Sequence, residues 1–272
     1  MMRLLCWNVQ WCRGLDGKVD PARIAAHVRS TGADVACFQE VASCFPDLPG
    51  SRGEDQPVAL WKELPEHEPV AGWAVDVPGR DGARMRFGNL ILSRLPVARI
   101  LRHSLPWPAA ADVPSMPRIA VEAIVQAPFG PVRIVTTHLE YYCASHRASQ
   151  VRRLKEIFSE ARAERKHVDE PGPFRSHPAT ASTILCGDFN MPAGDPLHGE
   201  VLSIGLIDAW QALHPDEPHP PTFRLHEEKE GIAPYCCDFV FVTPDLAPRL
   251  RAIRVDTDSR ASDHQPVVLE LT

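Results

Sequence analysis

The clearest signal of the fold lies in one short stretch, Thr183-Ile184-Leu185-Cys186-Gly187-Asp188-Phe189-Asn190. Residues 183–187 form an apolar run typical of a short buried strand. Asp188 and Asn190 follow directly, at a strand end, where rigid scaffolds usually present functional side chains. Because they are two positions apart, their side chains face the same side in extended geometry. The stretch therefore predicts a buried strand that ends in a polar site.

The same arrangement, a polar residue beside an apolar strand, recurs along the chain. Each such residue alone is a weak signal, because polar residues at strand ends are often turn residues. Together they have a chemical logic: Asn, Glu and Asp supply hard oxygen ligands, which suit Mg²⁺ or Mn²⁺ rather than zinc. A His beside a carboxylate can be oriented as a base or as a cation. The recurring residues are Asn8, Glu40, His138, Asp238, Asp263 and His264.

Periodicity predicts many strands and a few helices. Asp20 and Pro21 open one helix as N-cap and first residue, with Ile24, Ala25 and Val28 on its apolar face. Further helices are expected over 145–165 and 196–204. The strand at 118–126 alternates well enough to have one solvated face. Strands are expected over residues 2–9, 34–39, 70–77, 87–93, 97–104, 118–126, 132–138, 183–187, 238–242, 250–257 and 267–271. This pattern indicates two packed sheets with helices outside.

Length and composition limit the class of protein. A chain of 272 residues is near the upper size for one core, so we expect one domain over 1–272. With 44% apolar and 24% charged residues, a soluble globular protein is expected, without a transmembrane helix. A net charge of −6 argues against gripping duplex nucleic acid mainly through phosphates. The 8 Cys form no Cys-x-x-Cys pair and no targeting signal is seen, which favours buried reduced thiols and a cytoplasmic location.

Several short segments resemble the endonuclease/exonuclease/phosphatase superfamily, the deoxyribonuclease I-like fold. They occur in the family's order and span residues 6–266: Cys6-Trp7-Asn8-Val9, Phe38-Gln39-Glu40-Val41, Gly88-Asn89-Leu90-Ile91-Leu92-Ser93, Thr137-His138-Leu139-Glu140, Cys186-Gly187-Asp188-Phe189-Asn190, Cys237-Asp238-Phe239-Val240-Phe241 and Ser262-Asp263-His264-Gln265-Pro266. The resemblance implies an α+β protein, a four-layer α/β/β/α sandwich of two mixed, mainly antiparallel sheets flanked by helices. It also implies a metal-dependent phosphoric ester hydrolase.

The resemblance also implies a metal site for Mg²⁺ or Mn²⁺. Glu40 would be the principal ligand, with Asn8 in or next to the coordination shell. Asp263 would complete or support the site.

The remaining family positions imply the chemistry of water attack at phosphorus. His264 would lie opposite the phosphate, paired with Asp238. Asp188 would orient or deprotonate the attacking water, and Asn190 would hold phosphate oxygens. His138 would donate to a non-bridging oxygen.

The substrate is narrowed by departures from subfamily patterns. The abasic-site endonucleases typically have other residues at the positions of Val41 and His138. Residues 234–239 lack the Trp and Arg of the inositol polyphosphate phosphatase signature. Residues 137–140 and 186–190 resemble a branch of bacterial hydrolases and tyrosyl-DNA phosphodiesterase-like enzymes. We therefore expect a phosphodiester substrate, nucleic-acid or nucleotide-like. The alternatives are a small or lipid-derived phosphoester and a catalytically silent binding module. No obligate protein partner is expected.

Three further residues are candidate substrate contacts. Asn89 is expected to anchor the floor of the site by hydrogen bonds. Arg118 suits a substrate contact and a structural ion pair equally. Tyr142, beside Tyr141, could stack on a base, although ordinary packing explains it as well. The Pro-rich segment 215–234 is interpreted as an insertion rather than a lid.

Overall fold

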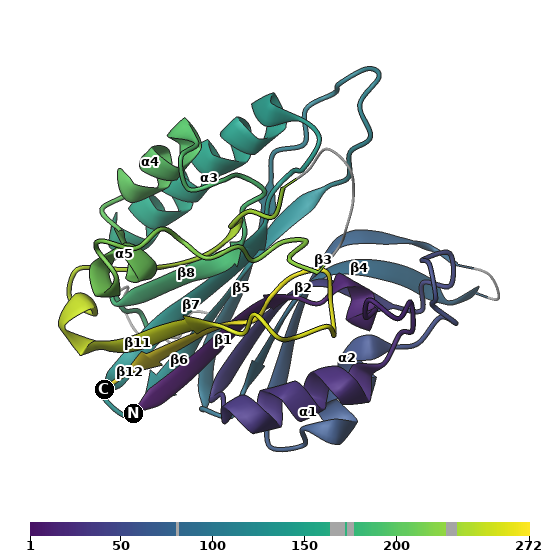
Figure 1. The fold of residues 1–272 in the computed structure, drawn as a ribbon, viewed down its shortest axis with the longest axis horizontal. Helices are drawn as coiled ribbons and strands as arrows, with labels where there is room; N and C mark the ends of the chain where they lie inside the picture. The colour runs from purple at the N-terminus through teal and green to yellow at the C-terminus, as the bar shows by residue number, and fades with distance from the viewer. Residues whose placement is uncertain (80–81, 164–171, 173–176, 227–232) are drawn as a thin grey trace.

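Two six-stranded sheets pack face to face, and helices cover the two outer faces (Figure 1). This architecture comes from a computed structural model, which describes residues 1–79, 82–163, 172, 177–226 and 233–272. The predicted α+β sandwich of two mixed, mainly antiparallel sheets is confirmed. In the described part of the chain, no helix is both long enough and apolar enough to cross a membrane.

The first sheet holds the N-terminal strands and both C-terminal ones. Its only parallel pair among the described residues is β1 with β2, which places Asn8 opposite Gln39. Helices α1 (Pro21–Thr31) and α2 (Gln56–Glu63) lie on its outer face (Figure 1). The strand order is β11 (Leu250–Val255), β12 (Val267–Leu271), β1 (Met2–Asn8), β2 (Val35–Ser43), β4 (Arg84–Ser93) and β3 (Glu68–Pro78).

The second sheet is built from the middle of the chain. Parallel β7 and β8 put His138 opposite Asp188, and antiparallel β10 puts Asp238 on the other side of Asp188. Its outer face carries α3 (Ala144–Ala163), α4 (Pro196–Leu202) and α5 (Ala209–Leu213) (Figure 1). The strand order is β5 (Val97–Leu105), β6 (Arg118–Ala127), β7 (Gly130–His138), β8 (Thr183–Asp188), β10 (Asp238–Val242) and β9 (Ile207–Asp208). Short 3-10 helices occur at Gln10–Cys12 and Ala247–Arg249.

Helix α1 forms as the sequence predicts. The Asp20 side chain accepts a hydrogen bond from the backbone N–H of Arg23, and Pro21 occupies the first turn. A cap of this kind is worth about 1 kcal/mol. The predicted apolar face is buried against the first sheet and completes one layer of the core.

One expectation about local structure is wrong, and two short helices were not predicted. The strand at 118–126 has no solvated face: in β6 only Gln126 is exposed, because the other sheet covers one face and α3 the other. Helix α2 was not predicted. Pro57 fits there because the first turn of a helix needs no backbone N–H, and Asp55 caps it by accepting from the N–H of Val58. Helix α5 was not predicted either. Residues 164–165 of the helix expected over 145–165 lie outside the described residues.

Candidate active site

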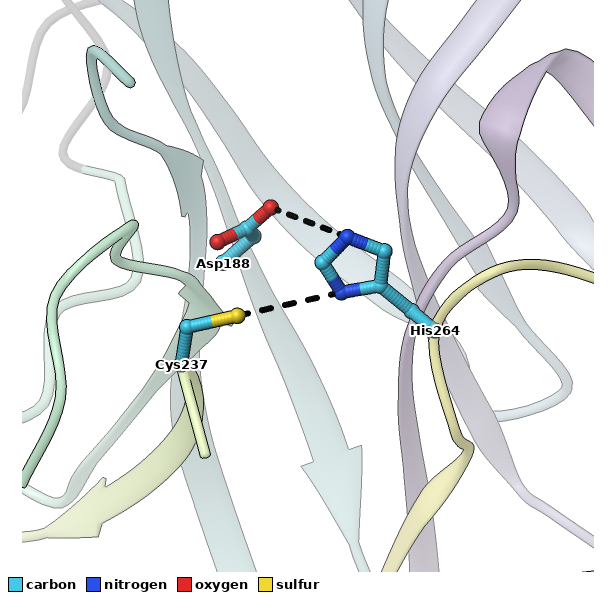
Figure 2. Close-up of side chains that lie close together, drawn as sticks. All are labelled: Asp188, Cys237 and His264. Carbon is cyan, nitrogen blue, oxygen red and sulfur yellow. Dashed lines mark hydrogen bonds and ion pairs between the residues drawn. The ribbon is translucent and has the colours of Figure 1, made fainter. Parts of the chain in front are cut away.

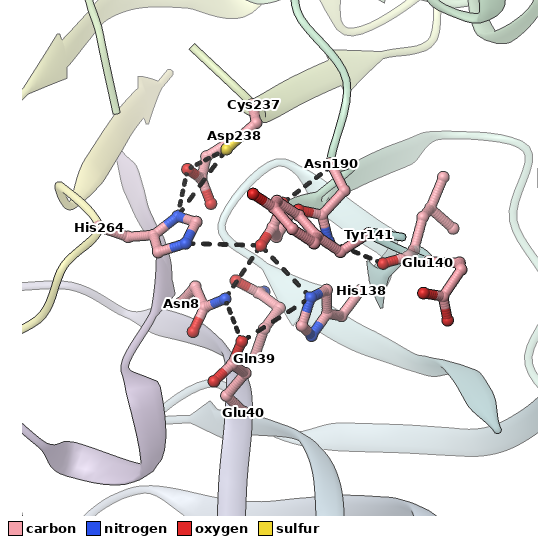
Figure 3. Close-up of polar contacts among 12 residues, drawn as sticks. Asn8, Gln39, Glu40, His138, Glu140, Tyr141, Asn190, Cys237, Asp238 and His264 are labelled. Atoms are coloured by element: carbon pink, nitrogen blue, oxygen red, sulfur yellow. Dashed lines mark hydrogen bonds and ion pairs between the residues drawn. The ribbon is translucent and has the colours of Figure 1, made fainter. Parts of the chain in front are cut away.

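The predicted polar residues meet where strands of the two sheets end. Figure 3 shows polar contacts among several of them, including Asn8, Glu40 and His138. Asn8 ends β1, and Glu40 lies next to the β2 residue paired with Asn8. From the facing sheet come His138 and Asp188 at the ends of two parallel strands. Strand pairing and the packing of the two sheets therefore bring together residues that are far apart in the chain, such as Asn8 and Asp188, which are 180 positions apart.

Irregular backbone aims two of these side chains. Glu40 has φ of 57°, inside a β-bulge where the β2–β4 register shifts between Phe38 and Val41. A bulge of this kind redirects a side chain that regular pleating would point elsewhere. Asn190 has φ of 51°, just after β8. Left-handed backbone is uncommon for residues other than glycine and concentrates at functional sites.

Asp188 lies at the centre of the site and contacts several of its residues. Its Oδ2 accepts from the Asn8 amide at 3.0 Å and lies 3.4 Å from Nε2 of His138 and 3.7 Å from Nε2 of His264. Its Oδ1 accepts from the backbone N–H of Asn190 at 2.9 Å. Burial raises the pKa of the Asp188 carboxyl to about 6, against the opposing effect of His264. A carboxylate with such a pKa is suited to accept a proton near neutral pH.

His264 is held as a cation. Its Nδ1 lies 2.8 Å from Oδ2 of Asp238. Burial alone would lower the pKa of His264, but the charges of Asp238 and Asp188 outweigh it and raise the pKa to about 10. Cys237 lies on the same side, with its Sγ 4.0 Å from Nδ1 of His264 (Figure 2). Burial raises the pKa of the Cys237 thiol, so it stays protonated.

His138, in contrast to the charged His264, is neutral. Burial, together with the positive charges of Arg118 and His264, holds its pKa well below the ordinary value. It is therefore a neutral imidazole, which can donate one hydrogen bond and accept another. Two histidines a few ångströms from the same carboxylate thus have different charges.

Glu40 and Asp263 are the residues that could hold a divalent cation. Both line the same pocket. Burial and the negative charge of Asp263 raise the pKa of Glu40 to about 7. Carboxylates that repel each other in a partly buried site fit a hard cation such as Mg²⁺ or Mn²⁺.

Asn8 supports these carboxylates. Its amide nitrogen donates to Glu40 at 3.1 Å and to Asp188, while its oxygen accepts from the N–H of Gln10 at 3.0 Å. In this orientation Asn8 positions the carboxylates and does not present its oxygen to a cation. Gln10 also donates to Oδ2 of Asp263 at 2.7 Å. Gln10 was not predicted, because no spacing marks it.

These groups form the floor of an open pocket of about 420 Å³. This volume is within the range of small-molecule sites. Of the predicted residues, the pocket is lined by Glu40, Arg118, His138, Tyr142, Asp188, Asn190, Asp263 and His264. Asn8 and Asp238 are buried behind this surface.

Arg118 forms a structural ion pair and faces the pocket, while its role as a substrate contact stays a prediction. Its guanidinium lies 3.5 Å from Oε2 of buried Glu140, and it also lines the pocket. Its Nε lies in this ion pair, whereas its Nη1 is buried without a hydrogen-bond partner. An unsatisfied guanidinium N–H suits an oxyanion such as phosphate.

The structure does not place Asn89 on the pocket wall. Its amide donates to the carbonyl of Ile119 at 2.9 Å, which ties β4 to β6 and agrees with the expected anchoring role. Tyr142 is 63% exposed at the rim, and its ring meets that of Tyr141 edge-on. Its use as a substrate contact stays a prediction.

The pocket wall also contains residues that sequence reasoning missed. Phe223 packs its ring 4.6 Å from that of His264, and Arg224 lies over Phe223. Both belong to the segment interpreted as an insertion; residues 227–232 of that segment lie outside the described residues. Isolated bridges of Phe223 to Tyr235 and His264, together with the hydrogen bond from the backbone N–H of Arg224 to the carbonyl of Asp263, bring this segment to the site. No local sequence pattern encodes these contacts.

Comparison with known proteins agrees with this geometry. The model of the Endonuclease/Exonuclease/phosphatase family matches residues 5–264. No curated protein matches the chain. Among solved structures, an endonuclease/exonuclease/phosphatase from Beutenbergia cavernae has a TM-score of 0.71 at 24% identity, covering 99% of this chain and 71% of that one.

Two other solved structures have a named activity or ligand. The mannosyl-6-phosphatase Bt3783 of Bacteroides thetaiotaomicron has a TM-score of 0.71 at 18% identity, covering 100% of both chains. TDP2 of D. rerio, complexed with single strand DNA product, has a TM-score of 0.66 at 17% identity, covering 100% of this chain and 98% of that one. At these identities the likeness establishes a shared fold.

Proposed function

Because the chain belongs to the endonuclease/exonuclease/phosphatase family, whose members are phosphoesterase hydrolases, we propose that it hydrolyses a phosphodiester bond by water attack at phosphorus, with Mg²⁺ or Mn²⁺ as cofactor. The observation that supports this most strongly is the Asp188 carboxylate between a neutral and a charged histidine. One pocket thus combines a proton acceptor, a neutral donor and a fixed cation. Water attack on a phosphoester needs these three functions.

In this proposal each side chain of the site has a separate role. Asp188 orients the attacking water and takes its proton, while the N–H of Asn190 and the amide of Asn8 hold the carboxylate in place. His264 and Arg118 face the phosphate with positive charge, and His138 donates to a non-bridging oxygen. A divalent cation bound by Glu40 and Asp263 would supply Lewis-acid charge to the phosphate oxygens.

A nucleic-acid or nucleotide-like phosphodiester is our preferred substrate. Tyr141 and Phe223 form an aromatic wall beside the polar floor, and aromatic rings are the usual stacking surface for an unpaired base. The complex of TDP2 with single strand DNA product supports this preference. A cytoplasmic location remains a prediction from the cysteine pattern.

The pocket size favours a second candidate, a small phosphoester. A volume of about 420 Å³ accommodates a nucleotide or a sugar phosphate rather than a long strand. The relative named as a mannosyl-6-phosphatase supports this candidate. The lipid-derived phosphoester and the silent binding module have no comparable support.

The test is hydrolysis of bis-p-nitrophenyl phosphate with Mg²⁺ or Mn²⁺, followed by a panel of single-stranded oligonucleotides, nucleotides and sugar phosphates. Activity should disappear with EDTA and fall at least about 100-fold in E40A and H264A. The matched control is E63A, which removes an exposed carboxylate from α2. Full activity in E40A would exclude our metal site, and no turnover with any divalent metal would favour the binding module.

A further inference from the structure

A second group of side chains with the chemistry of metal ligands lies outside the pocket. It consists of His198 in α4, Asp208 at the end of β9, and His219 in the segment before Phe223. The three side chains are at least nine-tenths buried, with exposed fractions of 4%, 1% and 8%. They come from three separate segments of the chain, so this convergence depends on the tertiary structure.

The three potential ligand atoms point toward one place. Nε2 of His198 and Nε2 of His219 each lie 2.9 Å from the same oxygen, Oδ2 of Asp208. All three atoms lie within 4.8 Å of one another. The other oxygen, Oδ1, accepts the backbone N–H groups of Trp210 and Gln211, which fixes the carboxylate plane.

Aromatic packing holds both imidazole rings in these positions. The ring of His198 lies 5.0 Å from that of Phe239 and 5.5 Å from that of Phe241. The ring of His219 lies 5.3 Å from Phe239. Rings fixed in this way lose little further freedom when a ligand binds, so the site is preorganised.

We propose that His198, Asp208 and His219 form a structural site for a borderline transition metal, best matched by Zn²⁺. Two imidazoles and one carboxylate suit zinc, whereas Mg²⁺ prefers oxygen ligands alone. Tetrahedral ligands about 2.0 Å from zinc lie about 3.3 Å from one another. The His–Asp distances of 2.9 Å therefore need to open by only a few tenths of an ångström.

A water molecule would complete the coordination of the cation. A cavity of about 10 Å³, close to the space that one water needs, is lined by Asp208, His219 and Cys236. The cation would cross-link α4, the β9–α5 junction and the segment that leads to Phe223 and Arg224. It would thereby order one wall of the active pocket without touching the reacting atoms.

The competing explanation is a plain hydrogen-bonded cluster, in which both imidazoles donate to Asp208. Measuring bound zinc distinguishes the metal site from the hydrogen-bonded cluster. Wild type, H219Q, H214Q and E40A are stripped with chelator, dialysed against Zn²⁺ and analysed by mass spectrometry for bound zinc. H214Q is the matched control, because His214 stacks on Trp210 at 4.3 Å and its Nδ1 lies 3.7 Å from a carboxylate oxygen of Glu217. E40A removes a ligand of the active pocket.

We expect H219Q to hold one equivalent of zinc fewer than wild type, and H214Q to hold as much as wild type. E40A should retain the equivalent that H219Q loses. Zinc should also raise the Tm of E40A but not that of the double variant E40A/H219Q, which lacks ligands in both sites. Equal zinc in wild type and H219Q would overturn the proposal.

A second measurement avoids the risk that H219Q misfolds. E40A keeps all three proposed ligands, and loading it with Co²⁺ should produce the intense visible absorption of a four-coordinate site. Absence of these bands from folded E40A would equally overturn the proposal.

Discussion

His264 and Asp238 are joined across the two halves of the sandwich by a buried hydrogen bond of 2.8 Å between imidazole Nδ1 and carboxylate Oδ2. Asp238 begins β10 of the second sheet, whereas His264 lies in the segment that enters β12 of the first. The bond therefore fixes both the orientation and the charge of the histidine at the pocket floor.

Replacing Asp238 by Asn should remove this fixed charge. The pKa of His264, raised to about 10 in the wild type, should fall toward its ordinary value near 6.5. Because the imidazolium exists below its pKa, D238N should lose activity as the pH rises through neutrality, with kcat about 100-fold lower at pH 8. A pH–rate profile and NMR titration of His264 measure this. D256N, which removes a partly exposed carboxylate near His27, is the control; an unchanged His264 titration in D238N would contradict the assignment.

Arg118 should contribute to substrate affinity through the unsatisfied N–H groups of its Nη1. A hydrogen bond to a charged group is worth about 1.5–3 kcal/mol, so R118M should lower kcat/KM about 10- to 100-fold. Steady-state kinetics on the best substrate of the panel measures the effect. R86M provides the comparison, since Arg86 pairs with Asp76 on the surface. If both variants behave alike, Arg118 has only a structural role.

Glu122 should stabilise the fold in a pH-dependent way. Burial would raise its pKa, but the neighbouring His103, Arg133 and Arg99 outweigh burial and lower it to about 2. Because the unfolded carboxyl titrates near 4.3, the stabilisation is present above that pH and is lost as the pH falls toward 2. The shift corresponds to about 3 kcal/mol.

Urea unfolding of wild type and E122Q at pH 7, 5 and 3 measures this contribution. The difference in free energy of unfolding should shrink as the pH falls. E156Q, at an exposed ion pair of α3, should show almost no difference at any pH. A difference for E122Q that stays constant down to pH 3 would show that the carboxylate charge is not the cause.

Two glycine-to-alanine substitutions should change the free energy of unfolding in opposite directions. Gly187 has φ of 147°, and a Cβ there would lie 2.0 Å from the carbonyl oxygen of Thr137. G187A should therefore lower the free energy of unfolding by about 1–3 kcal/mol and displace Asp188. Gly199, in α4, faces open space, and a Cβ added there would meet nothing within 4 Å, so G199A should stabilise by about 0.5–1 kcal/mol. Thermal unfolding of both variants checks the signs; equal stability of G187A and wild type would mean that β7 and β8 separate easily.

Local chemistry explains what was predictable in the fold. The Asp20 cap and Pro21 lie within one turn of each other and mark the start of α1 unaided. The α2 helix was missed because its Pro57 is typical both of loops and of a first helical turn. The strand at 118–126 was misjudged because a sequence does not reveal which faces of a strand are covered.

By itself, the sequence determined the family, the two-sheet architecture and the residues able to carry the chemistry, because these depend on periodicity and on short motifs. Only the tertiary structure decided the protonation states of these residues. His138 is neutral and His264 is charged because burial and neighbouring charges act differently on identical side chains. The same holds for Arg118, Phe223 and the His198–Asp208–His219 cluster, whose partners are distant in the chain and become neighbours only when the strands pair.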